Sequence, residues 1–301
     1  MTEFTHRTVL LAEAVELLKP EAGKVIVDGT LGGGGHTEAL LKAGATVIGI
    51  DRDPMALAAA KARLVGFGER FTALQGEFGD VGSLISTPVD GFLLDLGVSS
   101  PQIDTPERGF SFQNDGPLDM RMSQSGPTAA ELIETTEEGE LADLIYKFGD
   151  ERFSRQIARQ LKRVLPKTTF AAVDCVKAGV PRAAWPKEIN VATRTFQALR
   201  IAVNRELEQV DAAVAAVPSI LKKGGRAAFI TFHSLEDRIV KRAFRALCDT
   251  TDETPRGFPV QKMKVAHFAD LTRKPISASD QEVSENPRAR SALLRAVEKV
   301  S

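Results

Sequence analysis

Short apolar runs alternate with amphipathic or alanine-rich stretches through the first third of the chain. The apolar runs predict strands over residues 24–28, 46–51, 71–75 and 90–95, and the stretches between them predict helices over residues 9–18, 37–43 and 54–64. Apolar residues fill the strands almost continuously, which is typical of a parallel sheet buried on both faces. The pattern therefore predicts an α/β fold with a doubly wound, mostly parallel sheet.

The alternation stops after the fourth predicted strand. Residues 99–114 are rich in Pro, Gly, Ser and Asp, and residues 128–210 are helical in pattern with no clear strand. A turn over residues 221–226 then leads into a strand over 227–232, and residues 291–297 can form a last strand beyond a loop-rich, basic stretch. We interpret residues 126–205 as an inserted helical domain for substrate recognition, and residues 1–125 and 206–301 as the catalytic domain.

Composition restricts the possible functions only weakly. The 301 residues include 39 Lys and Arg against 40 Asp and Glu, a formal net charge of −1. Such a balance does not indicate a nucleic-acid-binding protein, so any contact with RNA must depend on a local basic patch. The two cysteines, Cys175 and Cys248, lie far apart and near no Cys/His cluster. We therefore expect neither a disulfide nor a metal site.

The sequence also indicates the compartment. The first residues precede no long apolar run, and no stretch approaches the roughly 20 apolar residues that cross a bilayer. We expect a cytoplasmic protein without a membrane partner.

A glycine run stands between the first strand and the first helix after it. Asp28 ends the strand, and Gly32, Gly33, Gly34 and Gly35 precede His36. A phosphate-binding P-loop would continue with Gly-Lys-Ser/Thr, and the dinucleotide fingerprint would place a third glycine where Thr37 stands. The remaining pattern resembles the first motif of class I methyltransferases, which bind S-adenosylmethionine, although Thr30 replaces the usual first glycine.

Three further residues follow successive strands on the edge where open α/β sheets bind ligands. Asp51 can accept hydrogen bonds from a ribose diol, Phe78 can pack on an adenine, and Asp95 can accept from the amine that is methylated. Each has an alternative role: Asp51 can cap a helix, Phe78 can belong to the core, and Asp95 and Gln102 can bind cofactor or cap a turn. Neither cysteine follows the fourth strand, which favours direct transfer without a covalent enzyme intermediate.

Longer motifs resemble the RsmH (MraW) family. They are residues 28–36, 50–54, 95–101, 108–112, 116–121, 192–200, 232–238 and 286–291, and the resemblance runs from His6 to the C-terminus. It implies methylation of the exocyclic N4 amine of one cytidine in bacterial small-subunit (16S) ribosomal RNA. It also implies cofactor contacts at Gly34, Gly35, His36, Asp51, Phe78, Asp95 and Gln102. Residues 189–191 depart from the family's usual His-Pro, which leaves the local turn in doubt.

Several basic and aromatic residues are candidates for contact with ribosomal RNA or with the 30S particle. One set of arginines recurs at helical spacing: Arg152, Arg155, Arg159 and Arg163. An apolar stripe lies on the opposite face of that helix and consists of Phe153, Ile157, Leu161 and Val164. Further candidates are Arg194, Arg200, Arg205, Phe110, Phe112, His233, Arg288 and Arg290. The arginines can equally form a solvated face, and the two phenylalanines can fill a core. His233 follows the fifth strand, so it is also a candidate catalytic residue that contacts the acceptor, although it can equally be structural.

Two other functions stay open at this stage. One is an assembly factor that binds cofactor and RNA without turnover, although chemical motifs at every strand end argue against it. The other is a nicotinamide-dependent oxidoreductase, which the failed fingerprint disfavours. The sequence leaves open whether the chain is a monomer or a homodimer, which group accepts the proton, and whether free rRNA or an assembled subunit is the substrate.

Overall fold

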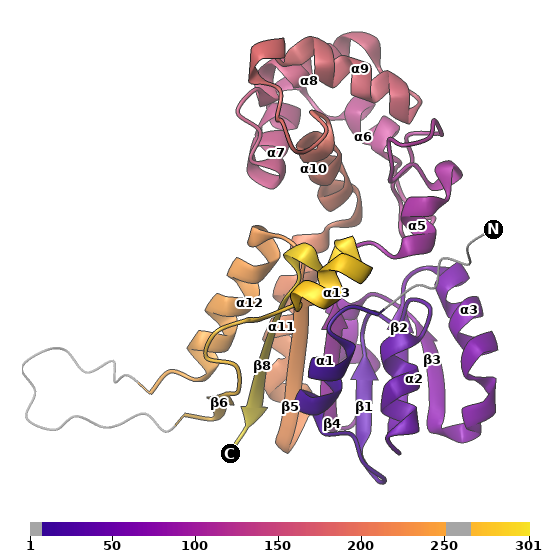
Figure 1. The fold of residues 1–301 in the computed structure, drawn as a ribbon, viewed down its shortest axis with the longest axis vertical. Coiled ribbons are helices and arrows are strands. Elements are labelled where there is room, and N and C mark those ends of the chain that lie inside the picture. The colour runs from indigo at the N-terminus through magenta and orange to yellow at the C-terminus, as the bar shows by residue number, and fades with distance from the viewer. Residues whose placement is uncertain (1–7, 251–265) are drawn as a thin grey trace, which may run out of the picture. The chain divides into compact units, whose positions relative to one another are not determined.

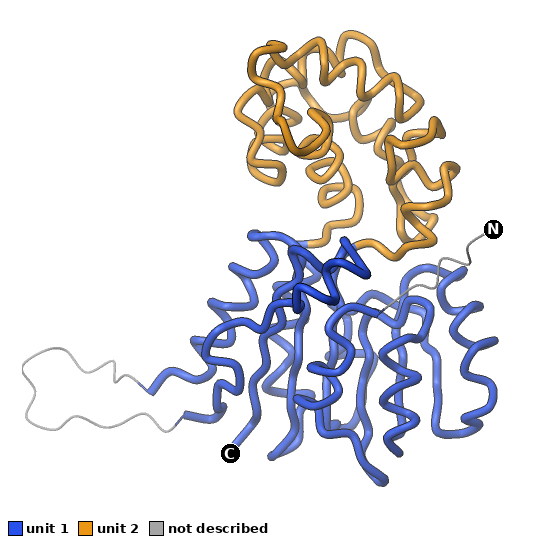
Figure 2. The backbone as a smooth tube through the Cα atoms, in the orientation of Figure 1, with its two compact units in different colours: residues 1–97, 207–301 blue, residues 98–206 orange. Residues whose placement is uncertain are grey.

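A computed structural model describes residues 8–250 and 266–301 of the chain (Figure 1). The chain divides into two compact units, residues 1–97 with 207–301 and residues 98–206 (Figure 2). Among the described residues, no helix is long and apolar enough to cross a membrane.

The first unit is built on one sheet. Its strands are β1 (Val25–Asp28), β2 (Thr46–Asp51), β3 (Phe71–Gln75), β4 (Val89–Asp95), β5 (Leu221–Thr231), β6 (Phe268–Asp270), β7 (Ile276–Ser277) and β8 (Leu293–Lys299). Their order is β3-β2-β1-β4-β5-β8-β6, with β7 also paired to β8. The pairs from β3 to β5 are parallel, whereas β8 runs antiparallel to its neighbours. The predicted doubly wound, mostly parallel sheet is confirmed.

Helices cover both faces of this sheet (Figure 1). They are α1 (Leu11–Leu18), α2 (Gly35–Lys42), α3 (Pro54–Leu64), α4 (Val81–Leu84), α11 (Glu206–Ile220, its first residue assigned to the second unit) and α12 (Ser234–Leu247). The unit also contains the short helix α13 (Asp280–Glu285). Strand residues alternate between the two cores: Ile26 and Leu93 pack with α1, α2 and α3, while Val27 and Phe92 pack with α4, α11 and α12. Both faces are therefore buried, as the continuous apolar strands predict.

The turn expected at residues 221–226 forms inside β5. Leu221 pairs with Val89 and Arg226 with Gly91, so the residues between them bulge out of the ladder. Gly224 lies there at a φ of 79°, a left-handed conformation that glycine adopts without a steric penalty. The strand is thus longer than predicted but irregular where the turn was expected.

The second unit is helical. Its elements are α5 (Ser100–Asp104), α6 (Ala129–Thr135), α7 (Glu138–Gly149), α8 (Ser154–Val164), α9 (Thr169–Gly179) and α10 (Thr193–Asn204), with short 3-10 turns η3 (Pro106–Arg108) and η4 (Arg182–Ala184). The unit begins at Val98 rather than at residue 126. Leu118 and Met120 explain the difference, because both are buried in the same core as Ile133 and Leu161. The second boundary lies within one residue of the expected position.

The departure from the family pattern at residues 189–191 does not prevent a turn. The Asn190 side chain accepts a hydrogen bond from the Ala192 amide at 2.9 Å, and its carbonyl accepts one from Thr193 at 3.0 Å. These bonds begin α10 in the way that Asn commonly does ahead of a helix.

Candidate active site

The glycine run forms the turn between β1 and α2 in the first unit. Gly32 and Gly34 have φ angles of 49° and 80°, so both positions favour glycine. A Cβ on Gly35 would lie 2.0 Å from the Thr8 hydroxyl, whereas one on Gly33 would meet no atom within 4 Å. The helix end of the run is therefore closely packed, and its middle faces open space.

Asp51 ends β2, and its carboxylate holds the glycine run by a hydrogen bond. Its two carboxylate oxygens accept hydrogen bonds from the amides of Gly32 and Asp53, each at 2.8 Å. Asp53, rather than Asp51, caps α3 by accepting from the Met55 amide at 3.0 Å, so the alternative role of Asp51 as the cap is wrong. Each oxygen of a carboxylate can accept a second hydrogen bond. Asp51 is only partly buried, so it retains acceptor capacity for a diol.

Asp95 ends β4, beside the same turn. Its amide donates to the Thr30 hydroxyl at 2.6 Å, which gives the residue at the position of the usual first glycine a structural role. Its Oδ2 lies 3.6 Å from Nδ1 of the buried His36, whose Nε2 is 3.1 Å from the Val9 carbonyl oxygen. Its Oδ1 is buried and has no hydrogen-bond partner among the described residues. Buried acceptors in proteins usually have a hydrogen-bond partner, so this oxygen is suited to accept a hydrogen bond from an N–H or O–H group of a ligand.

Two buried carboxyl groups, those of Asp28 and Glu236, lie close enough to Asp95 to affect its ionisation. Burial raises the pKa of Asp28 to about 6, against hydrogen bonds from Thr37 and Thr30 that favour its ionised form. Burial raises the pKa of Asp95 well above its ordinary range, and the charges of Asp28 and Glu236 raise it further. Burial also raises the pKa of Asp51. These three aspartates follow adjacent strands, and a cationic ligand beside them would favour their ionised forms.

Sequence reasoning missed Glu236. This buried residue of α12 accepts from the Phe232 amide at 2.9 Å and closes a capping box with His233, whose ring accepts from the Glu236 amide. His233 is thus the N-cap of α12, which supports its structural alternative. The spacing His-Ser-Leu-Glu was the available signal, because a residue that caps a helix is often answered by Glu three positions later.

Phe78 and Gln102 also have structural partners. Phe78 begins η2 (Phe78–Asp80) and packs partly buried against the core that contains Phe92 and Leu94. Gln102 belongs to the second unit, where its side chain accepts from the Ser99 amide at 3.0 Å in the capping box of α5. The structure therefore brings Gly34, Gly35, His36, Asp51, Phe78, Asp95 and His233 onto the first unit and places Gln102 on the second.

The candidate RNA-contacting residues divide into paired and unpaired groups. Arg155 and Arg163 are exposed on α8 without an ion-pair partner among the described residues, whereas the exposed Arg159 lies 3.6 Å from a Glu138 carboxylate oxygen. Arg152 precedes that helix and lies over the Phe153 ring. Arg200 forms a two-bond ion pair with Glu206, with both contacts at 2.8 Å, and this occupies its guanidinium.

The apolar residues of this set also differ from expectation. Val164 is 51% exposed, so its assignment to the apolar stripe is wrong: α8 ends there, and Leu165 turns left-handed. Phe110 and Phe112 pack against the helical core, and the Phe112 ring meets Phe196 edge-on at 5.1 Å. Their packing favours the core alternative.

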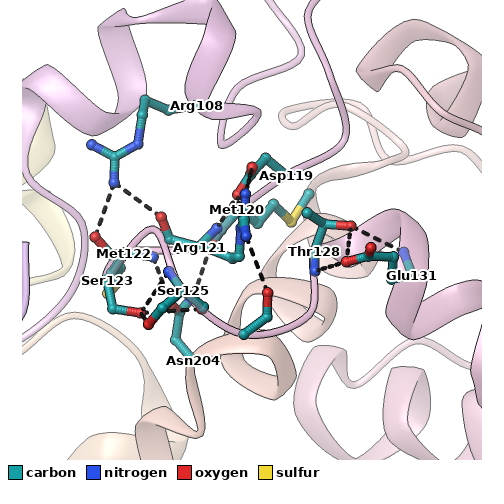
Figure 3. Close-up of polar contacts among 11 residues, drawn as sticks. Arg108, Asp119, Met120, Arg121, Met122, Ser123, Ser125, Thr128, Glu131 and Asn204 are labelled. Atoms are coloured by element: carbon teal, nitrogen blue, oxygen red, sulfur yellow. Dashed lines mark hydrogen bonds and ion pairs between the residues drawn. The ribbon is translucent and has the colours of Figure 1, made fainter.

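A polar network orders the loop before α6 in the second unit (Figure 3). Arg108 donates to the carbonyls of Arg121 and Met122 at 2.9 and 3.0 Å, and Arg121 pairs with Asp119 at 2.7 Å. Asn204 donates to the Met120 carbonyl and accepts from the Met122 amide. These bonds hold Met120 at a φ of 63° and tie this loop to the end of α10.

The order of the strands, the glycine turn before α2 and the three carboxylates at the strand ends together define the chain as a class I S-adenosylmethionine-dependent methyltransferase. The match to known proteins narrows this class. Residues 3–300 match the model of the MraW methylase family, and the chain belongs to that family.

The chain is similar to its relatives over almost their whole length. The chain is 60% identical to the ribosomal RNA small subunit methyltransferase H of Myxococcus xanthus, over 99% of both chains. It is 52% identical to the protein of the same name from Anaeromyxobacter sp. (strain Fw109-5), again over 99% of both, and 50% identical to that of Trichlorobacter lovleyi over 100% of both.

Proposed function

We propose that the chain transfers a methyl group from S-adenosylmethionine to the exocyclic N4 amine of one cytidine in small-subunit (16S) ribosomal RNA. The observation that carries the proposal is the buried Oδ1 of Asp95, an acceptor without a partner among the described residues, at the end of the strand beside the glycine turn. The family and the names of its whole-length relatives support the RNA substrate. Such an enzyme would act in the cytoplasm, where ribosomal subunits assemble.

The residues of the first unit fit the proposed cofactor. The Asp51 carboxylate has acceptor capacity for a ribose diol, and Gly32 and Gly33 expose backbone that a ligand can approach. When bound, the cofactor supplies an electrophilic methyl group on a positively charged sulfur. That charge suits a site with raised carboxyl pKa values at Asp28, Asp51 and Asp95.

Asp95 acts on the amine in this proposal. The N4 lone pair of cytosine is delocalised into the ring, so the amine is a weak nucleophile until its geometry changes. The ionised Oδ1 of Asp95 accepts an amine N–H, which holds the lone pair toward the methyl group and stabilises the charge that develops on nitrogen. Thr30 fixes the Asp95 backbone and His36 faces its other oxygen, so the accepting atom is positioned before the substrate arrives.

Mass spectrometry of nucleosides tests the reaction. Small-subunit rRNA without this modification, both free and within the 30S particle, is incubated with the chain and a methyl-labelled donor. We expect the label on the N4 atom of cytidine. Label on a ring carbon, on the protein, or nowhere despite tight binding of both ligands would overturn the proposal.

A matched pair of variants tests the role of Asp95. Asp95→Asn keeps the size of the side chain but loses the anionic acceptor, and we expect kcat to fall about 100-fold or more, with a smaller loss of donor affinity because the sulfonium charge loses one anionic neighbour. Asp90→Asn, at the other end of β4 with Lys222 as its partner, removes an equal charge away from the site and should retain its activity. Equal losses in the two variants would show that Asp95 acts only through folding.

A further inference from the structure

The sequence of the helical unit separates its charges. Residues 104–151 contain twelve Asp and Glu against three Lys and Arg, whereas residues 152–205 contain twelve Lys and Arg against two Asp and Glu. Arg155 and Arg163 of α8 are exposed and form no hydrogen bond or ion pair with the described residues, whereas Arg159 between them pairs with Glu138. An exposed helix with unpaired arginines at this spacing is suited to a polyanion such as RNA.

A cavity of about 320 Å³ lies between α8 and the end of α9. It is lined by Gln156, Arg159, Gln160, Ala178, Gly179, Val180 and Pro181. Gly179 permits the close approach of the two helices, because a Cβ there would lie 2.8 Å from Cα of Ile157. Its volume is at the lower end of the range for small-ligand pockets, about 300–1,000 Å³.

The chemistry of the walls favours a base over a phosphate. Gln160 belongs to the wall of this cavity, and its Oε1 is buried without a hydrogen-bond partner among the described residues, so the wall holds an acceptor that needs a donor. The carboxyl end of α9 carries partial negative charge, which disfavours an anion and favours N–H groups. Nucleobases present N–H donors beside carbonyl and ring-nitrogen acceptors, and a glutamine amide can pair with both kinds of group.

We propose that this cavity receives one unpaired base of the RNA substrate. Gln160 accepts from the polar edge of the base, and Arg159 lies at the wall of the same cavity. Arg155 and Arg163 stand one helical turn to either side of Arg159, so they can contact the phosphates that flank the base. The inference rests on the proposed function because it assigns a second point of contact to the same RNA substrate.

Steady-state kinetics of Gln160→Leu test the contact. We expect KM for small-subunit rRNA to rise about three- to tenfold, the ratio typical of one lost hydrogen bond, with kcat and donor affinity unchanged. The dependence of RNA binding on salt should match that of the wild type, because no charge is removed. Lys177→Gln is the control on α9. Lys177 pairs with Asp174 and with no other described residue, and its replacement should change KM less than twofold. Equal KM values for the two variants would overturn the inference.

Photocrosslinking and direct binding separate this inference from the proposed function. rRNA that contains 4-thiouridine is crosslinked to the full chain, and we expect adducts on peptides that contain residues 156–160 or 178–181. Adducts found only on other peptides would overturn the inference. Fluorescence anisotropy with the same RNA measures binding without turnover. If Gln160→Leu weakens RNA binding but the wild type transfers no methyl group, the proposed function fails and the inference stands. If Gln160→Leu methylates RNA normally at low RNA concentration, the inference fails and the proposed function stands.

Discussion

Replacing Asp28 by asparagine should change how the stability of the first unit depends on pH. Asp28 is buried, and its pKa is about 6 instead of the ordinary 3.8. At about 1.4 kcal/mol per pH unit, this difference corresponds to about 3 kcal/mol. The folded state binds this proton more tightly than the unfolded state, so the stabilisation is fully present below about pH 4 and is lost as the pH rises through about 6. An asparagine side chain cannot ionise, so the Asp28→Asn variant should escape this loss.

Denaturant unfolding of the wild type and Asp28→Asn at pH 4 and pH 7.5 measures the effect. The difference in unfolding free energy between the two proteins should move by about 3 kcal/mol in favour of the variant between these pH values. The single Trp and single Tyr, Trp185 and Tyr146, both belong to the helical unit. Their fluorescence therefore reports the unfolding of the helical unit. Any change in far-UV circular dichroism after that unit has unfolded reports the unfolding of the first unit.

A constant difference between the two proteins across this pH range would refute the reasoning. It would mean that the hydrogen bonds from Thr37 and Thr30 offset the cost of burying the charge. The amide of the introduced asparagine can donate to the Thr37 hydroxyl while its oxygen accepts from Thr30, so loss of packing should be small and similar at both pH values. The same variant should move the acidic limb of the pH–rate profile to lower pH, because the charge of Asp28 raises the pKa of Asp95.

Two further variants test the glycine turn and the cofactor contact. Gly35→Ala should destabilise the first unit by about 1–3 kcal/mol, because its Cβ would overlap the Thr8 hydroxyl. Gly33→Ala should cost less than about 1 kcal/mol, because a Cβ there meets no atom within 4 Å. Chemical denaturation measures both losses, and equal losses would contradict this packing. Asp51→Ala should weaken binding of S-adenosylmethionine by about 1–3 kcal/mol in calorimetric titration, and unchanged affinity would show that Asp51 serves only to hold Gly32.

Local sequence pattern was sufficient for the parallel strands of the first third of the chain and failed where distant contacts decide the structure. The predicted strands at residues 46–51 and 71–75 are confirmed to the residue, because apolar runs bounded by turns report burial directly. The strands β6 and β7 were missed because they have three and two residues and depend on pairing with β8. The start of the helical unit was placed too late because Leu118 and Met120 join its core through contacts with residues far along the chain.

The candidate site was predictable to a similar degree. The glycine run, Asp51 and Asp95 stand at strand ends, so their place on one edge of the sheet follows from the α/β pattern. The hydrogen bond from Asp95 to Thr30 and the burial of Glu236 depend on the register between β4, β5 and the turn after β1, which no local pattern contains. The cofactor contacts at Gly34, Gly35, His36, Phe78 and Gln102 stay predictions, and each of these residues also has a packing or capping role.

The position of the helical unit in the chain has a consequence for synthesis on the ribosome. β4 pairs with β5 in the folded sheet, yet residues 98–206 are made between these two strands. At about 5–20 residues per second, translation of that stretch takes roughly 5 to 20 s. Through this interval β1, β2, β3 and β4 are complete, while the edge of β4 that will receive β5 exposes the unpaired backbone of an apolar strand. The growing chain therefore passes through a stage that is open to aggregation, and early folding of the helical unit would not shorten it.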